Sequence, residues 1–326
     1  MIARHHKTRP IRILVASLLL GLLNACSALD ALNASVGPGA YQRIANKNYG
    51  PHPRQSLDVY VPNYLSGPAD VILFFYGGRW QSGNKRDYRF VAEAFTSKGL
   101  ITVIPDYRLF PEVAYPVFNQ DAAAAYQWVE THIQNFQGNP KRIFIAGHSA
   151  GAYLAAMVTL NERLQKSAGI KTPPCGMIGM AGPYDFLPFT DEDIKQVFAS
   201  ADHPIETQPI HYVNGTEAAM LLLYGEADDI VWPHNARNLV DAVHLLGGQA
   251  TLITYSNVGH ASLAASLARP LRHIAPTLKD VTYFIRQTRC ISRLEVMPFE
   301  YAKRMIFKRM AGSYTGRPFS SFLTAG

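Results

Sequence analysis

Charged residues are scarce in this 326-residue chain, at 17% of the sequence, and cysteine is scarcer still, with three in all. No internal repeat is visible. None of the eleven histidines has metal-ligand spacing with other His, Cys or acidic residues, so the sequence implies no metal, and we expect no cofactor. Hydrophobic residues reach 48%, the balance of a globular protein rather than a disordered one. The length suits one large α/β domain with both faces of its sheet covered.

The net charge of +7 belongs to the two ends of the chain. Residues 1–25 carry four basic residues and no acid, and residues 287–326 carry seven basic residues against two acids. The region between them is therefore slightly acidic. A nucleic-acid-binding surface is not expected on it, because such surfaces are basic.

The N-terminal residues are typical of a targeting segment. A basic stretch, 4–12, precedes an apolar stretch, 13–23, that is too short to span a bilayer comfortably. The next residues, Leu-Asn-Ala-Cys ending at Cys26, resemble a bacterial lipobox, which implies lipidation of Cys26 and a membrane anchor in the cell envelope. Ser27 resembles the signal for sorting to the outer membrane, facing the periplasm. Plain signal-peptide cleavage and an uncleaved anchor are the alternatives.

The remaining chain divides into a tether at 26–54, one α/β domain at 55–287 and a basic C-terminal extension at 288–326. Apolar runs of strand length recur along the domain, and stretches with helical spacing lie between them. Uninterrupted apolar runs indicate strands buried on both faces of a parallel sheet, so we predict a doubly wound, mostly parallel sheet with helices on both faces. The expected strands are 56–61, 71–76, 101–105, 142–146, 175–181, 219–224 and 250–255, and the clearest expected helices are 89–98, 119–135, 150–161, 235–246 and 270–286.

Three features outside this pattern leave alternatives open. Residues 185–217 hold no obvious strand and are either a small cap over the site, which we favour, or a surface excursion. Residues 299–310 have a basic amphipathic pattern that suits either a helix packed on the domain or one lying on anionic lipid. Cys175 and Cys290 are either a disulfide, which a periplasmic location would permit, or two separate buried thiols.

The strongest motif is Gly-His-Ser-Ala-Gly at 147–151, which fits the G-x-S-x-G pattern. It follows an expected strand and opens an expected helix, which is the strand–turn–helix context that a nucleophilic serine requires. Glycine at both ends removes Cβ atoms that would collide with neighbouring elements. Ser149 is therefore the predicted nucleophile, and His148 is interpreted as a structural residue that points away from the reacting carbonyl.

A serine hydroxyl needs a base to remove its proton, and the expected chain order is serine, acid, histidine. Acidic residues follow the expected strand 219–224, at Glu226, Asp228 and Asp229. His260 follows the next expected strand and is the predicted base. A carboxylate from the acid segment can accept a hydrogen bond from the imidazole and fix its tautomer.

Glycines also mark the end of an earlier strand, in Tyr-Gly-Gly-Arg-Trp at 76–80. Backbone N–H groups there can converge with that of Ala150 on a developing oxyanion, and each such donor stabilises the transition state by roughly 3–4 kcal/mol. The predicted oxyanion hole is made by the N–H groups of Gly78, Arg79 and Ala150.

Together these segments resemble the esterase branch of the α/β-hydrolases, over about residues 55–287. More narrowly they resemble carboxylesterase, feruloyl-esterase-like and kynurenine formamidase-like enzymes with an HGGxW motif, although Tyr76 stands where that motif has histidine. The resemblance implies Asp228 as the third triad member, through the same Gly-x-x-Asp-Asp spacing. It implies that Asp106 and Arg108 brace a loop, and that Trp80, Tyr184 and Phe186 are either pocket walls or ordinary core.

The sequence thus predicts a serine hydrolase that cleaves small carboxylic esters through an acyl-enzyme intermediate. An arylformamidase is the rival within enzymes, and a lipid-anchored, non-catalytic binding protein on the same fold is the rival of another class. A dipeptidyl-type peptidase would use the same triad, but the roughly 30 residues between Cys26 and the first expected strand leave no room for its large accessory domain.

Overall fold

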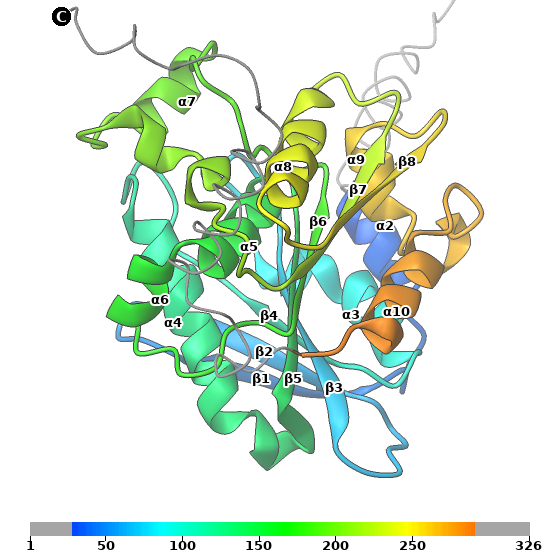
Figure 1. The fold of residues 1–326 in the computed structure, drawn as a ribbon. Helices are drawn as coiled ribbons and strands as arrows, with labels where there is room; N and C mark the ends of the chain where they lie inside the picture. The colour runs from blue at the N-terminus through cyan, green and yellow to red at the C-terminus, as the bar shows by residue number, and fades with distance from the viewer. Residues whose placement is uncertain (1–27, 291–326) are drawn as a thin grey trace, which may run out of the picture.

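The computed structural model describes residues 28–290, and these contain an eight-stranded sheet of order β1-β2-β4-β3-β5-β6-β7-β8 (Figure 1). The strands are β1 Gln42–Asn48, β2 Ser56–Val61, β3 Ala69–Phe75, β4 Ile101–Pro105, β5 Gly138–His148, β6 Gly176–Met180, β7 Ala219–Gly225 and β8 Ala250–Tyr255. Strand β2 pairs antiparallel with β1 and β4, and the neighbours from β4 through β8 pair in parallel. The carboxyl ends of β3 to β8 therefore meet at one edge of the sheet.

Helices cover both faces of the sheet. One face carries α4, α5, α6 and α8, and the other carries α3 and α10, with α2 beside α3 (Figure 1). The helices are α2 Ala28–Ala34, α3 Arg89–Thr96, α4 Val117–His132, α5 Ala150–Leu160, α6 Glu162–Ser167, α7 Glu192–Val197, α8 His234–Leu245, α9 His260–Ala265 and α10 Thr277–Gln287. The predicted fold class, a doubly wound and mostly parallel sheet, is confirmed.

The core lies in the middle of the sheet, where β2, β4 and β6 are buried along their whole length. Helix α5, which follows the G-x-S-x-G motif, is also buried at every residue. A helix that is apolar all round belongs in the interior, so the element behind Ser149 is fixed by packing on all sides.

The prediction of a tether over residues 26–54 is wrong for much of that range. Helix α2 packs beside α3, and its buried Asn33 donates to the carbonyl of Arg86 at 3.2 Å. Strand β1 extends the sheet, and Arg43 forms a 2.6 Å ion pair with the buried carboxylate of Asp58. The sequence did not reveal this strand because β1 is polar and almost entirely exposed, so it lacks the alternation of a half-buried strand.

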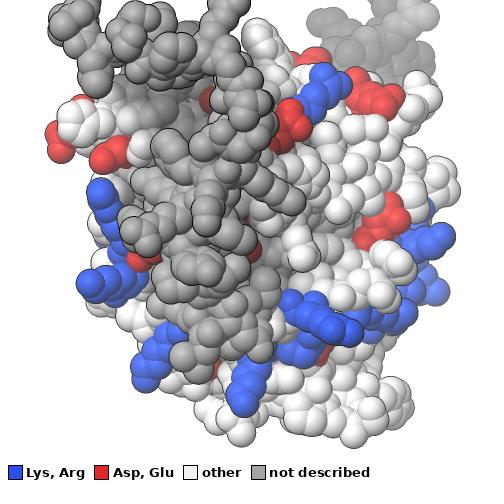
Figure 2. Space-filling model, viewed as in Figure 1, with Lys and Arg blue, Asp and Glu red and all other residues white. Residues whose placement is uncertain are grey.

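Residues 185–217 contain no strand in the structure, as expected, but helix α7 and the short 3₁₀ turns η3 Pro204–Thr207 and η4 Pro209–Tyr212. Figure 1 shows α7 beyond the carboxyl ends of the strands. On the face drawn in Figure 2, acidic side chains are mostly near this upper edge, and basic ones are more common over the lower half. We call residues 185–217 the cap segment.

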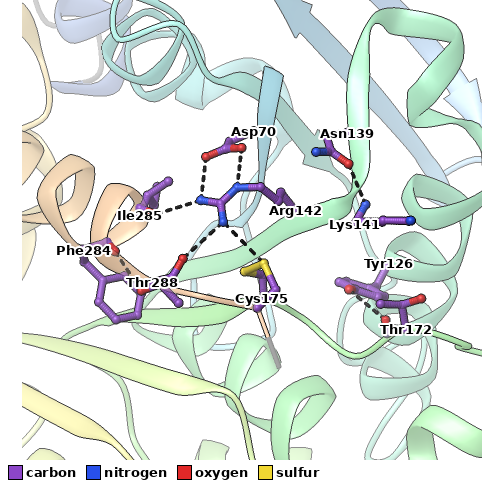
Figure 3. Close-up of a disulfide and its surroundings, with 11 residues drawn as sticks. Asp70, Tyr126, Asn139, Lys141, Arg142, Thr172, Cys175, Phe284, Ile285 and Thr288 are labelled. Carbon is purple, nitrogen blue, oxygen red and sulfur yellow. Dashed lines mark hydrogen bonds and ion pairs between the residues drawn. A yellow bond between two sulfur atoms is a disulfide. The ribbon is translucent and has the colours of Figure 1, made fainter. Parts of the chain in front are cut away.

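At the opposite edge, Cys175 and Cys290 form a disulfide that joins the residue before β6 to the third residue after α10, closing a separation of 115 residues. Arg142 of β5 lies beside it (Figure 3). Its guanidinium holds Asp70 through two hydrogen bonds of 2.7 and 2.9 Å, and also donates to the carbonyls of Ile285 and Thr288 at the end of α10. Of the two alternatives, the structure therefore has the disulfide.

Several sequence-based interpretations lie outside the described residues. These are the targeting segment, lipidation of Cys26 and the amphipathic pattern at 299–310. Within residues 28–290, no helix is long and apolar enough to cross a membrane.

Candidate active site

Ser149 is the single residue between the end of β5 and the start of α5. Its backbone has φ 56° and ψ −125°, a conformation that residues with a Cβ rarely adopt, and its N–H donates to the carbonyl of Met180 at 2.9 Å. The flanking glycines permit this turn. A Cβ at Gly147 would lie 2.2 Å from the backbone of Gly151, and one at Gly151 would lie 2.1 Å from the carbonyl oxygen of Phe75. The close packing holds a strained turn that projects the serine from the strand tip.

His260 and Asp228 form a direct pair although 32 residues separate them in the chain. His260 opens α9 after β8, and Asp228 follows β7, so the adjacent ends of two parallel strands bring them together. His260 Nδ1 donates to Asp228 Oδ2 at 2.8 Å, and the two side chains are 10% and 0% exposed. Because Nδ1 carries the proton in the neutral ring, Nε2 is left as an acceptor that can take a proton.

The Asp228 carboxylate is fixed by further donors. Its Oδ1 accepts the backbone N–H groups of Ile230 at 2.9 Å and Val231 at 3.0 Å. Burial alone raises the pKa of this carboxyl, but the hydrogen bonds from His260 and the two N–H groups outweigh burial, and the pKa lies below its ordinary value. Asp228 is therefore ionised at neutral pH and favours a proton on the facing imidazole nitrogen.

The two other acids of this segment do not contact His260. Glu226 is exposed and accepts hydrogen bonds from Thr254 at 2.9 Å and Ser256 at 2.7 Å, and Asp229 is exposed. Among the three acids that the sequence left open, the structure brings Asp228 to the imidazole.

His148 lies directly against His260, a contact that the sequence did not indicate. Its Nε2 donates to the backbone carbonyl of His260 at 3.0 Å, and the two ring centroids are 4.7 Å apart. Burial, followed by the nearby His260, lowers the pKa of His148 to about 3, so this ring stays neutral beside the candidate base. Within the described residues no hydrogen bond joins Ser149 Oγ to His260, and His148 provides the contact between the serine turn and the histidine.

The segment Tyr-Gly-Gly-Arg-Trp at 76–80, which we call the oxyanion loop, packs against the serine turn. A Cβ at Gly77 would lie 3.0 Å from Cβ of Ser149. The loop has positive φ at three successive residues, 130° at Gly78, 55° at Arg79 and 60° at Trp80. The backbone N–H groups of Gly78, Arg79 and Ala150 donate to no acceptor within residues 28–290. Unpaired donors beside a candidate nucleophile are the arrangement that stabilises an oxyanion.

Tyr76, the residue that departs from the HGGxW pattern, is the first residue of this loop, and its side chain holds the loop in place. Its ring stacks between Tyr88 and Tyr107, at centroid distances of 5.3 and 4.9 Å. Its hydroxyl donates to Asp106 at 2.8 Å, and Tyr107 donates to the Tyr76 carbonyl at 2.9 Å. Asp106 also binds the buried ammonium of Lys85 at 2.9 Å. Tyr76 is fully buried and thus takes part in support of the loop.

Arg108 forms a bidentate pair with the buried carboxylate of Asp121, with bonds of 2.7 and 2.9 Å. The resemblance implied that Asp106 and Arg108 brace a loop, and both side chains make contacts that fit this role. Neither contacts His260 or Ser149 within the described residues.

The three candidate pocket residues are placed differently. Tyr184 is 1% exposed and belongs to the core. Trp80 is 3% exposed and packs on Phe198, with ring centroids 4.9 Å apart, while its indole N–H has no partner within residues 28–290. Phe186 is half-buried and stacks on Trp80. Phe186 therefore remains the best candidate for a wall, and Trp80 is a core residue with one free donor.

No group of three His, Cys, Asp or Glu side chains in the described part of the chain could hold a metal ion. The groups available for chemistry are a serine in a strained turn, an imidazole oriented by a carboxylate, and three unpaired backbone donors. The profile of the BD-FAE family matches residues 57–243, which include Ser149 and Asp228.

The chain belongs to the BD-FAE family.

Curated relatives include a probable isoprenylcysteine alpha-carbonyl methylesterase of Arabidopsis thaliana, 25% identical over 66% of this chain and 50% of that protein. The kynurenine formamidase of Salmo salar is 25% identical over 74% of this chain and 82% of that protein. The chain spans about half to three-fifths of the length of the plant methylesterases that it matches. These relatives place the BD-FAE chain beside enzymes that act on esters and on a formamide.

Among solved structures, a carbohydrate esterase from gut microbiota matches this BD-FAE chain with a TM-score of 0.67. It is 20% identical and aligns over 77% of this chain and 98% of its own. Identity this low supports the fold alone, which is that of the α/β-hydrolases.

Proposed function

We propose that this protein is a serine carboxylesterase in which Ser149, His260 and Asp228 act together. The observation that carries the proposal is the 2.8 Å pair between Asp228 and His260 beside a serine held at φ 56°. The unpaired N–H groups next to that serine support it further. Family membership and the methylesterase relatives agree with ester hydrolysis.

The proposed reaction has two halves. His260 Nε2 takes the proton from Ser149 Oγ as the oxygen attacks the acyl carbon, and Asp228 stabilises the imidazolium that forms. The N–H groups of Gly78, Arg79 and Ala150 bind the tetrahedral oxyanion. His260 then protonates the leaving alcohol, and water repeats the sequence on the acyl-enzyme to release the acid. The low pKa of His148 keeps a second positive charge away from the imidazolium.

Hydrolysis of p-nitrophenyl acetate by the purified protein tests the proposal. We expect turnover by the wild type and a loss of at least about 10³-fold in kcat for Ser149→Ala, since removing a triad serine alone costs nearly as much as removing the whole triad. Turnover by Ser149→Ala at the wild-type rate would contradict the proposal.

An arylformamidase is the second candidate, because the kynurenine formamidase relative aligns over most of its own length. N-formylkynurenine and p-nitrophenyl acetate, compared at equal concentration, separate the two functions. The carboxylesterase proposal expects the higher kcat/KM on the ester. A higher kcat/KM on the formamide would assign amide hydrolysis to the same residues.

We further propose that Cys26 carries a lipid that anchors the enzyme to the outer membrane of a bacterial envelope, facing the periplasm. The support is the sequence pattern at 23–27. Metabolic labelling with an alkyne fatty acid should mark the wild-type protein and leave Cys26→Ser unmarked. Equal labelling of both proteins would contradict the anchor at this residue.

A further inference from the structure

Helix α7 of the cap segment has two different sides. Its buried side carries Ile194 and Val197, followed by Phe198, whose ring packs edge-on against Trp80 of the oxyanion loop. Its acidic side carries Asp193, with Asp191 just before the helix. The cap segment is therefore in contact with the oxyanion loop through an apolar surface. Asp193 of the helix and Asp191 just before it also present two carboxylates to the loop.

Both carboxylates bind the Arg79 side chain. Arg79 Nη2 donates to Asp193 Oδ1 and Oδ2 at 2.8 and 2.7 Å, and Nε donates to Asp193 Oδ2 at 3.1 Å. Nη2 also donates to Asp191 at 3.0 Å, and Gln81 donates to Asp193 at 3.2 Å. Asp191 and Asp193 are 112 and 114 positions from Arg79 in the chain. Within residues 28–290 the guanidinium has no other hydrogen-bond or ion-pair partner, so Asp191 and Asp193 alone hold it.

The backbone of Arg79 needs such a restraint. Its φ of 55° and the φ of 60° at Trp80 are strained for residues with a Cβ, and strained backbone persists only where its surroundings fix it. The Trp80 end is anchored by Phe110, whose N–H donates to the Trp80 carbonyl at 2.8 Å. Gln81 and Ser82 donate to the carbonyl of Gly78. Arg79 itself is exposed, and its side chain is the part of the residue that has a fixed partner.

We propose that Asp193, assisted by Asp191, is a positioning residue that acts through the Arg79 side chain to hold the N–H groups of Gly78 and Arg79 toward the oxyanion. This inference rests on the proposed function, because it assigns the cap segment a part in the same site. It predicts that the ion pair affects the chemical step and contributes little to folding, since exposed ion pairs contribute little to stability.

The test compares Asp191→Asn/Asp193→Asn with Glu192→Gln in hydrolysis of p-nitrophenyl acetate. Glu192→Gln is the control, because it removes one negative charge from the same helix. The only ion pair of Glu192 among the described residues is with Lys195. We expect kcat of the double variant to fall about tenfold with KM within twofold, since small misplacements of catalytic groups cost up to about 100-fold. Asp193→Glu should recover most of the loss, and Glu192→Gln should match the wild type.

The salt dependence of kcat provides a second measurement, in which the wild type and the double variant are compared. At 1 M NaCl the screening length is about 3 Å, so kcat of the wild type should fall toward that of the double variant, which itself should change little. Thermal unfolding of all variants within about 2 °C of the wild type would place the effect in the site and not in the fold.

Equal kcat for the wild type and the double variant would overturn the inference, as would a change in KM alone or an equal loss in Glu192→Gln. These outcomes leave the proposed esterase function standing, because they require an active wild type. An inactive wild type would instead contradict the proposed function.

Discussion

The carboxyl and amino edges of the sheet are held by different means. At the carboxyl edge, Ser149, Arg79 and Trp80 have positive φ, and backbone donors beside them are unpaired. At the amino edge, the Cys175–Cys290 disulfide and the Arg142 guanidinium join β3, β5 and β6 to the end of α10. Ser149 and the oxyanion loop thus combine strained residues and unpaired donors where we place the chemistry, and the disulfide lies at the opposite edge. Substitutions at the first edge should therefore change activity, and substitutions at the second should change stability.

Asp228→Asn should produce the largest separation between activity and stability. An amide cannot stabilise the imidazolium and favours the wrong tautomer of His260, so kcat on p-nitrophenyl acetate should fall by about 10³–10⁴-fold. The side chain keeps its size and an oxygen that accepts the N–H groups of Ile230 and Val231, so the fold should persist. Asp229→Asn and Glu226→Gln are the controls. A comparable loss of kcat in either control would assign the role of the triad acid to that residue and not to Asp228.

Removing the disulfide should lower stability and leave activity unchanged. Cys290→Ser should lower the free energy of unfolding by about 2–5 kcal/mol, because a cross-link across 115 residues restrains a long loop in the unfolded chain. Steady-state kcat at 25 °C should stay within twofold of the wild type. Cys175→Ser and the double variant should unfold at the same denaturant concentration as Cys290→Ser. A large loss of kcat with unchanged stability would break the contrast between the edges.

Arg142→Gln should have a smaller effect of the same kind. The substitution removes the guanidinium that binds Asp70, the carbonyl of Ile285 in α10 and the carbonyl of Thr288 just after it. The side chains of Arg142 and Asp70 are about a quarter exposed. We expect a loss of about 1–2 kcal/mol in urea unfolding. The neighbouring Lys141→Ala should change stability by no more than about 0.5 kcal/mol, because this side chain is exposed. Equal losses of unfolding free energy for both variants would show that the contacts of Arg142 do not stabilise this edge.

The smallest expected effect concerns pH. Since the folded state lowers the pKa of Asp228, its ionised form stabilises the fold above the unfolded pKa of about 4 and loses that contribution as pH falls through the folded pKa. As pH falls below about 4, the difference in unfolding free energy between the wild type and Asp228→Asn should change in favour of the variant. A constant difference down to pH 3 would contradict the lowered pKa.

Much of the fold could be predicted from the sequence, because buried parallel strands such as β4 and β6 are continuous apolar runs. Ser149 and His260 could also be proposed from the sequence, because each follows a predicted strand, although β8 before His260 is partly exposed. Strand β1 was missed because its residues are polar and exposed on both sides.

Contacts between distant segments account for the rest. The pairing of Arg79 with Asp193, the disulfide, and the contact of His148 with His260 each join residues more than 100 positions apart. No local periodicity reports such distances. A basic residue in the oxyanion loop and acids in a strandless segment were visible in the sequence, but only the fold brings them together.

Labelling with a fluorophosphonate probe tests the central claim most directly. The account predicts that the probe adds covalently to one residue of the purified protein, that peptide mapping places the adduct on Ser149, and that Ser149→Ala is unlabelled. Absence of labelling in the folded wild type, or an adduct on another serine, would contradict it.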